Sequence, residues 1–229
     1  MMMVKIATTS PLSENSMSVA ALLTLSGGFL DAFTYVGHGN VFANAMSGNI
    51  VLLGVYTAEA DWAQAFRHIP PIIAFIIGVF IAHCMRLPQF KKYFANPPLT
   101  CLGLEIIFLL MGAFLPDTFP SNWLVPGIAF VAAMQNSSFT HIESLPYNSV
   151  MTTGNLRRSI EALFKGTVGP RNPLAFREAK LFGLICLCFL LGALIGAFAT
   201  IRLHNAALFI PVCILVAALL LLWPNRKAA

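Results

Sequence analysis

The chain has 229 residues, of which 58% are hydrophobic and only 10% are charged. Roughly a quarter of the residues in a soluble domain are charged, so this composition excludes a soluble enzyme, and its apolar content excludes a disordered chain. The net charge of +5 comes from basic residues between apolar segments, where the positive-inside bias explains them better than nucleic-acid binding. We therefore expect an all-α, polytopic integral membrane protein without a nucleic-acid partner.

Six apolar stretches are each close to the length of about 20 residues that crosses a bilayer. Trp123 and Trp223 lie at the ends of two of them, as is typical of the lipid interface. We expect residues 1–17 and 224–229 to be short tails, and 18–223 to be one transmembrane domain that begins with an uncleaved span. The six predicted spans are 18–36, 69–85, 99–115, 123–140, 181–201 and 206–223.

Two further stretches, residues 41–57 and 146–166, carry polar interruptions. Each contains a hydroxyl residue followed by Gly-Asn, at Ser47-Gly48-Asn49 and Thr153-Gly154-Asn155. Glycine tolerates backbone angles that end a helix, and asparagine can cap the helix that follows. We therefore predict two discontinuous segments whose free N–H groups suit an anion or a polar solute. The alternative is close helix packing by small residues.

The two Gly-Asn segments belong to a predicted two-fold internal repeat, with halves 18–115 and 123–223. Gly28-Phe29-Leu30-Asp31 precedes the first segment, as Ala133-Met134-Gln135-Asn136 precedes the second. Downstream, residues 75–81 resemble residues 189–195. Interrupted segments at matching positions of two repeats indicate a midplane binding site.

Charge bias favours six crossings over eight. If both Gly-Asn segments re-enter the side they came from, the repeats are inverted, and all fourteen Lys and Arg residues except Arg67 and Arg202 lie inside with both termini. If all eight segments cross, the repeats are parallel, and the basic residues outside are Arg86, Lys91, Lys92 and Arg202.

Asp31 lies near mid-membrane, where a carboxylate costs roughly 2.5–3.5 kcal/mol and marks a proton or cation site by default. The alternative is a structural group that hydrogen-bonds to neighbouring helices. Gln135 and Asn136 either join Asp31 at a cavity or bond between helices. Arg157 either meets an anionic solute or pairs with Glu161, four residues on.

The histidines and the five cysteines lack metal-ligand spacing, and no catalytic or nucleotide-binding motif is present, so we expect no metal, no cofactor and no enzyme activity. An intramembrane enzyme that pairs Asp31 with Glu105 or Glu161 is the least favoured hypothesis. The leading hypothesis is a secondary transporter or permease for a small polar solute or ion. The alternative is a non-catalytic membrane protein that binds a lipid or a protein partner. A homodimer is compatible with either. The candidate solute-binding residues are Asp31, Asn44, Ser47, Gly48, Asn49, Gln135, Asn136, Thr152, Thr153, Gly154, Asn155 and Arg157.

These motifs resemble the YoaK family of bacterial membrane proteins over nearly the whole chain. The family pattern is a Gly-x-x-Asp-Ala helix followed by a Val-Phe-x-x-x-Met-Thr-Gly-Asn segment, which residues 28–32 and 41–49 match with Ser47 in place of threonine. Ala133–Asn136 and Met151–Asn155 resemble the motif of the second half. The resemblance implies a multi-pass protein of the bacterial inner membrane, in a family whose activity is not established.

Overall fold

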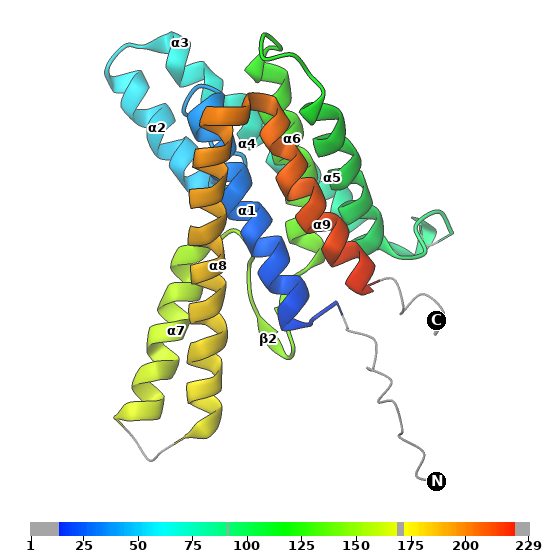
Figure 1. Ribbon diagram of the computed structural model, residues 1–229, viewed down its shortest axis with the longest axis vertical. Coiled ribbons are helices and arrows are strands. Elements are labelled where there is room, and N and C mark those ends of the chain that lie inside the picture. Colours follow the sequence, from blue (N-terminus) through cyan, green and yellow to red (C-terminus); the bar gives the residue numbers. More distant parts are fainter. Residues whose placement is uncertain (1–13, 91, 169–171, 223–229) are drawn as a thin grey trace.

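The computed structural model describes residues 14–90, 92–168 and 172–222 of the chain. Within these ranges the protein is a helical bundle with one short hairpin of two strands, β1 (His141–Ile142) and β2 (Leu145–Pro146) (Figure 1). The expected C-terminal tail, Trp223 and most of the expected N-terminal tail lie outside the described residues. The all-α class is confirmed.

All six apolar stretches form helices, five of them within three residues of their predicted bounds, whereas the helix predicted over 181–201 begins eight residues earlier, at Pro173. Proline and capping residues set several beginnings: the Asn96 side chain accepts a hydrogen bond from the Leu99 amide, and Asn172 accepts from the Leu174 amide, each just before a proline at the first helical position. The helices are α1 (Met17–Gly37), α4 (Ile69–Cys84), α5 (Pro97–Ala113), α6 (Ser121–Ser138), α8 (Pro173–Leu203) and α9 (Phe209–Leu222).

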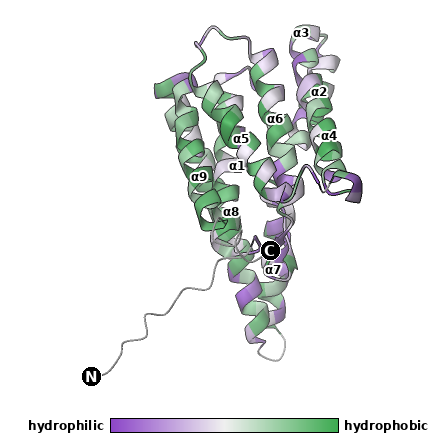
Figure 2. Ribbon diagram, turned by 90° about the vertical axis from the view of Figure 1, so that its right-hand side faces the viewer, coloured by the Kyte–Doolittle hydropathy of each residue, from purple (hydrophilic) through white to green (hydrophobic). Residues whose placement is uncertain are grey.

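By length and composition, three helical segments are suited to crossing a membrane: Met17–Gly37, Trp62–Cys84 and Pro173–Leu222. The last of these contains two antiparallel helices, because the chain reverses at η3 (His204–Leu208) between α8 and α9 (Figure 1). The apolar helix α5 has 17 residues and is slightly shorter. Most of α4, α5, α8 and α9 carries hydrophobic residues, whereas α7 carries many polar ones (Figure 2).

Two helices begin half-way along the bundle. The first, α2 (Met46–Ala58), rises from mid-height to the end of the bundle at which α1 finishes, and α7 (Thr152–Thr167) runs from mid-height to the opposite end (Figure 1). Each is followed by a long helix that returns through the bundle. The remaining short elements are α3 (Trp62–Ala65), η1 (Phe66–His68) and η2 (Pro88–Phe90).

The helices of the two predicted halves pack across one another. α1 contacts α8 and α9 of the second half, and α6 contacts α4 and α5 of the first half. Side chains of α1, α5, α6 and α9 form the largest apolar core, which includes Phe29, Phe33, Leu109, Ile128 and Leu215.

Glycines allow the closest of these helix pairs to touch backbone to backbone. A Cβ atom on Gly192 would lie 2.0 Å from the Leu25 carbonyl oxygen, and one on Gly28 would lie 2.1 Å from the Phe189 carbonyl oxygen. Both contacts join α1 to α8. Between α4 and α6, a Cβ atom on Gly78 would lie 2.5 Å from the Phe130 carbonyl oxygen. Small residues at such crossings increase van der Waals contact, which drives helix association in lipid.

Gly192→Ala should therefore destabilise the protein, because α1 and α8 must separate to admit the methyl group. We expect a cost of about 1–3 kcal/mol, with a fall in apparent Tm of about 2–4 °C for each kcal/mol, measured by thermal unfolding in detergent. Gly103→Ala is the matched control, since nothing lies within 4 Å of a Cβ atom there. Equal Tm values for the two variants would contradict the close contact.

Candidate functional site

The polar centre of α1 holds the loop that leads into α2. One carboxylate oxygen of Asp31, Oδ1, accepts hydrogen bonds from the backbone amides of Asn44 (2.7 Å) and Ala45 (3.3 Å). The Thr34 hydroxyl accepts from the Ala43 amide at 3.1 Å, and the Asn44 side chain donates to the Gly27 carbonyl at 3.3 Å. The loop is thereby drawn back into the bundle, so that α2 begins at mid-height.

Asn49 secures the same loop from the first turn of α2. Its Oδ1 accepts from the Phe42 amide at 2.9 Å, and its Nδ2 donates to the Phe42 carbonyl at 2.8 Å. The His68 ring Nδ1 lies 3.2 Å from the same Oδ1. Asn49 is completely buried, so its amide is a structural anchor rather than a group open to a solute.

The loop before α7 is held by comparable contacts between neutral groups. Asn155 donates to the carbonyl of Asn148, seven residues earlier, at 2.7 Å, just as Asn49 bonds to Phe42. The Ser149 hydroxyl donates to Asn136 Oδ1, thirteen residues earlier, at 3.4 Å, and the same spacing joins Asn44 to Asp31. An asparagine in α6 thus occupies the role that a carboxylate has in α1.

The predicted helix break at each Gly-Asn pair is wrong in its details. Gly48 and Gly154 are ordinary helical residues in the first turns of α2 and α7, and the N-cap positions belong to Ala45 and Met151, whose side chains cannot cap. The chain is interrupted before each motif, not at it. The reason is tertiary: the asparagine amides bond back to the preceding loops and therefore cannot act as local caps.

A cavity of about 830 Å³ lies between the two motifs. It is bounded by residues of α1, α2, α4, α6, α7 and α8 together with the loops before α2 and α7. Half of the candidate site residues line it, and they come from both halves of the chain: Asp31, Asn44, Ser47, Asn136, Thr152 and Thr153.

Three polar atoms at this cavity are buried without a hydrogen-bond partner among the described residues. They are Asp31 Oδ2, Asn44 Oδ1 and Thr152 Oγ1. Asp31 is 4% exposed and Asn44 is 5% exposed. A buried polar group without a partner costs about 1–3 kcal/mol, so these atoms indicate a place that a polar ligand or water satisfies.

The other candidate residues do not line this cavity. Gly48 lies against the Phe42 ring, and Gln135 is buried within α6. Gly154 and Asn155 line a separate pocket of about 220 Å³ beside Asn148. For Arg157 the sequence left two roles open, a contact with an anionic solute or an ion pair with Glu161. The Arg157 side chain is exposed, and its Nε lies 2.6 Å from Glu161 Oε1. This geometry favours the local ion pair over a solute contact.

Sequence reasoning missed the aromatic walls of the cavity, which are Tyr35, Phe42, Phe75 and Phe189. Tyr35 and Phe42 stack with ring centroids 4.8 Å apart. Phe42 belongs to the first motif, and Phe75 and Phe189 begin the two matching segments 75–81 and 189–195, but these patterns did not indicate that the rings line a cavity. Asn148, which also lines the cavity, was missed as well, although it lies seven residues before Asn155 as Phe42 lies before Asn49.

The fold and the cavity define an all-α membrane protein with an open cavity between its helices, in which a few polar residues lie among apolar walls. The chain belongs to the family described as "Protein of unknown function (DUF1275)", whose pattern matches residues 19–221. It is 25% identical over 202 residues to the UPF0700 transmembrane protein YoaK of Bacillus subtilis (strain 168). The aligned region covers 86% of this chain and 90% of the relative. The resemblance to the YoaK family is therefore confirmed. No solved structure matches the chain.

Asn49→Ala should destabilise the protein, because it leaves the partly buried Phe42 amide and carbonyl without their side-chain partners. We expect a cost of about 1–3 kcal/mol for each unsatisfied group, measured as a lower Tm in detergent. Ser47→Ala, in the same turn, is the control: its side chain is exposed, and we expect an unchanged Tm. If Asn49→Ala unfolded at the temperature of the Ser47 variant, the anchoring role would be refuted.

Proposed function

We propose that this protein is a small secondary transporter or permease of the bacterial inner membrane, and that a small polar solute passes through the cavity between its halves. The observation that carries the proposal is that one cavity is lined by polar residues of both Gly-Asn motifs and contains unpartnered buried polar atoms. Buried polar groups are ordinarily hydrogen-bonded, and three of the eight buried side-chain atoms without a partner among the described residues belong to residues that line this one cavity. No nucleotide-binding motif occurs in the sequence, so the transport would be secondary or passive.

An inverted repeat would supply the motion that such a transporter needs. The contact between Gly78 and the Phe130 carbonyl has a counterpart between Gly192 and the Leu25 carbonyl. If residues 28–31 are aligned with 133–136, and 75–81 with 189–195, the two contacts join equivalent positions. The axes support inversion, since α1 and α6 run in opposite directions (Figure 1). Rocking of one repeat against the other around a fixed site is the usual route to alternating access.

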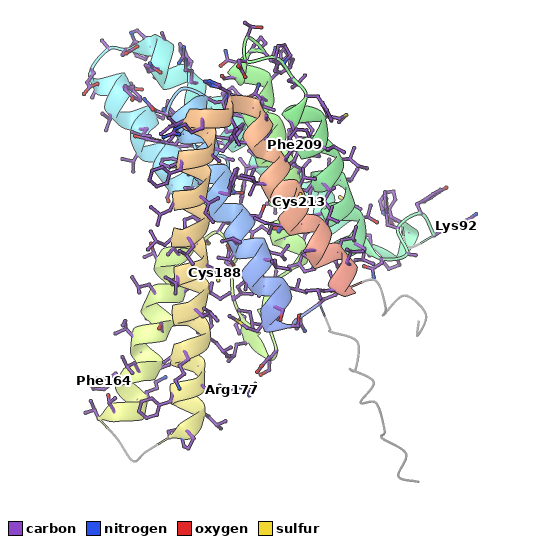
Figure 3. The ribbon with its side chains drawn as sticks, in the orientation of Figure 1. Lys92, Phe164, Arg177, Cys188, Phe209 and Cys213 are labelled. Carbon is purple, nitrogen blue, oxygen red and sulfur yellow. The ribbon has the colours of Figure 1, made fainter. Side chains whose placement is uncertain are left out.

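The orientation follows from the distribution of charge. Phe164 and Arg177 lie near the far end of the α7–α8 hairpin (Figure 3), and Lys165 and Lys180 belong to the same part of the hairpin. Arg67 and Arg202 lie at the opposite end. From the positive-inside bias we infer that the far end of the hairpin lies in the cytoplasm, on the side where α1 begins and α9 ends. The other described basic residues are Arg86 and Lys92, which follow α4, and Arg157 and Arg158, which lie near the beginning of α7.

Labelling of single cysteines tests this topology. Lys92 projects from the loop after α4 (Figure 3), and Asp117 lies in the loop between α5 and α6. With six crossings, an impermeant thiol reagent should modify Lys92→Cys only from the cytoplasmic side and Asp117→Cys only from the outer side. Eight crossings predict the reverse for both positions. The background should lack the native cysteines, which are Cys84, Cys101, Cys186, Cys188 and Cys213.

Accessibility of the cavity tests transport itself, whatever the solute. In the same cysteine-free background we expect Ser47→Cys and Thr153→Cys to be modified by an impermeant reagent added from either side of the membrane, because a transporter opens its site to each side in turn. Leu110→Cys is the control: Leu110 is exposed on the surface of α5, outside the cavity, and should remain unmodified from both sides.

Modification of the cavity from one side alone would refute transport and support the second candidate function, a membrane protein that binds a lipid or a partner. One observation favours a ligand with an apolar part. Met151, Leu190 and Leu194 line the cavity and are 61%, 54% and 47% exposed, so the mouth of the cavity is apolar. We also infer a non-enzymatic role, because neither Glu105 nor Glu161 lines the cavity with Asp31.

A further inference from the structure

We propose that the cavity binds a protonated amine attached to an apolar body, and that this ammonium group and a proton compete for Oδ2 of Asp31. The inference rests on the proposed transport function and specifies its substrate class and its coupling. The two carboxylate oxygens of Asp31 differ in their hydrogen bonds. Oδ1 is occupied by the amides of Asn44 and Ala45, whereas Oδ2 has no partner among the described residues.

The unpartnered atoms select a ligand that donates hydrogen bonds. Asn44 Oδ1 is a second acceptor without a partner among the described residues. Asn44 is held next to Asp31 because its backbone amide donates to the carboxylate, while its Nδ2 donates to the Gly27 carbonyl. The Thr152 hydroxyl can accept as well. A primary ammonium group carries three donors and no acceptor, which suits such a set. A carboxylate or phosphate would be repelled by Asp31.

The charge of Asp31 has no counter-charge in the cavity. Among the described lining residues, Asp31 and Tyr35 are the titratable ones, and no Lys, Arg or His lines the cavity. The elements around α1 carry further titratable side chains, but these do not line it either. They are Glu105 on α5, His68 on η1, Arg177, Glu178, Lys180, Cys186, Cys188 and Arg202 on α8, Cys213 on α9, and Arg157, Arg158, Glu161 and Lys165 on α7.

The rest of the cavity suits an apolar body. Its walls include the rings of Tyr35, Phe42, Phe75 and Phe189, and aromatic faces attract cations in addition to packing against apolar groups. The volume of about 830 Å³ lies in the range of about 300–1,000 Å³ that holds drug-sized ligands, far more than an ammonium group alone requires. The apolar mouth at Leu190 and Leu194 allows such a molecule to enter from the lipid.

Competition for one oxygen produces obligatory exchange. When the amine arrives, the carboxylic acid releases its proton and the resulting carboxylate holds the ammonium group, so one proton leaves for each cation that binds and no other bond changes. Both occupied forms are electrically neutral at Asp31. The empty carboxylate is a bare charge inside the membrane, which is costly, so the carrier reorients with either a proton or a cation and acts as an antiporter.

The test uses the full-length protein in detergent and three probes of similar shape: 2-phenylethylammonium, 2-phenylethanol and 3-phenylpropionate. Isothermal titration in two buffers with different protonation enthalpies counts the protons released. We expect the ammonium probe alone to bind, with release of close to one proton. Because a proton occupies Oδ2 at low pH, the affinity of the protein for the ammonium probe should fall as the pH decreases from 8 to 6, by up to tenfold per pH unit.

Asp31→Asn isolates the free oxygen, because the asparagine carbonyl can still accept from the amides of Asn44 and Ala45. We expect this variant to fold and to lose binding of the ammonium probe. Glu105→Gln is the matched control: Glu105 is 2% exposed and its Oε2 is also unpartnered, but it lies outside the cavity, so binding should be unchanged. If Asp31→Asn fails to fold, proton release and pH dependence in the natural protein still decide the outcome.

Different failures identify which proposal is wrong. Binding of the alcohol or the carboxylate in place of the amine, or of none of the three probes, would overturn the substrate class and leave transport to the accessibility experiment. Binding of the amine without proton release would overturn the exchange. Access to Ser47→Cys and Thr153→Cys from one side only would overturn transport and the antiport that rests on it, even if the amine binds.

Discussion

The structure depends on the pair of hydrogen bonds that Asp31 Oδ1 accepts from the amides of Asn44 and Ala45. A loop inside a bilayer must satisfy its backbone groups within the protein, since hydrocarbon offers no partner. The Asp31 carboxylate supplies that partner half-way along α1, and the Asn49 side chain in α2 bonds to the amide and the carbonyl of Phe42 in the same loop. With the loop held there, α2 begins at mid-height and leaves room for a cavity between it and α7.

The loops before α2 and α7 are both held by a polar side chain of the preceding long helix, which is ionisable in α1 and neutral in α6. Asn136 and Ser149 stand in the second half where Asp31 and Asn44 stand in the first. A second carboxylate at the same depth would add a repulsive charge with no counter-ion in the cavity. The asymmetry leaves one ionisable oxygen, and a single ionisable oxygen is what links one proton to one cation in the proposed exchange.

The glycine contacts explain why the cavity is shared. Gly28 and Gly192 bring α1 against α8, and Gly78 brings α4 against α6, so each half packs mainly on helices of the other. The walls of the cavity therefore come from both halves of the chain.

Composition and the lengths of the apolar runs by themselves determined the membrane class and the six apolar helices, because the hydrophobic length of a span is a local property. Asp31 was predicted because a polar residue inside a span is a local property as well. Only the tertiary structure decided that Asn49 and Asn155 are anchors, that Arg157 pairs with Glu161, and that Tyr35, Phe75 and Phe189 enclose the site. These outcomes depend on which helices meet and on which atoms are left without partners, and residues far apart in the chain set both.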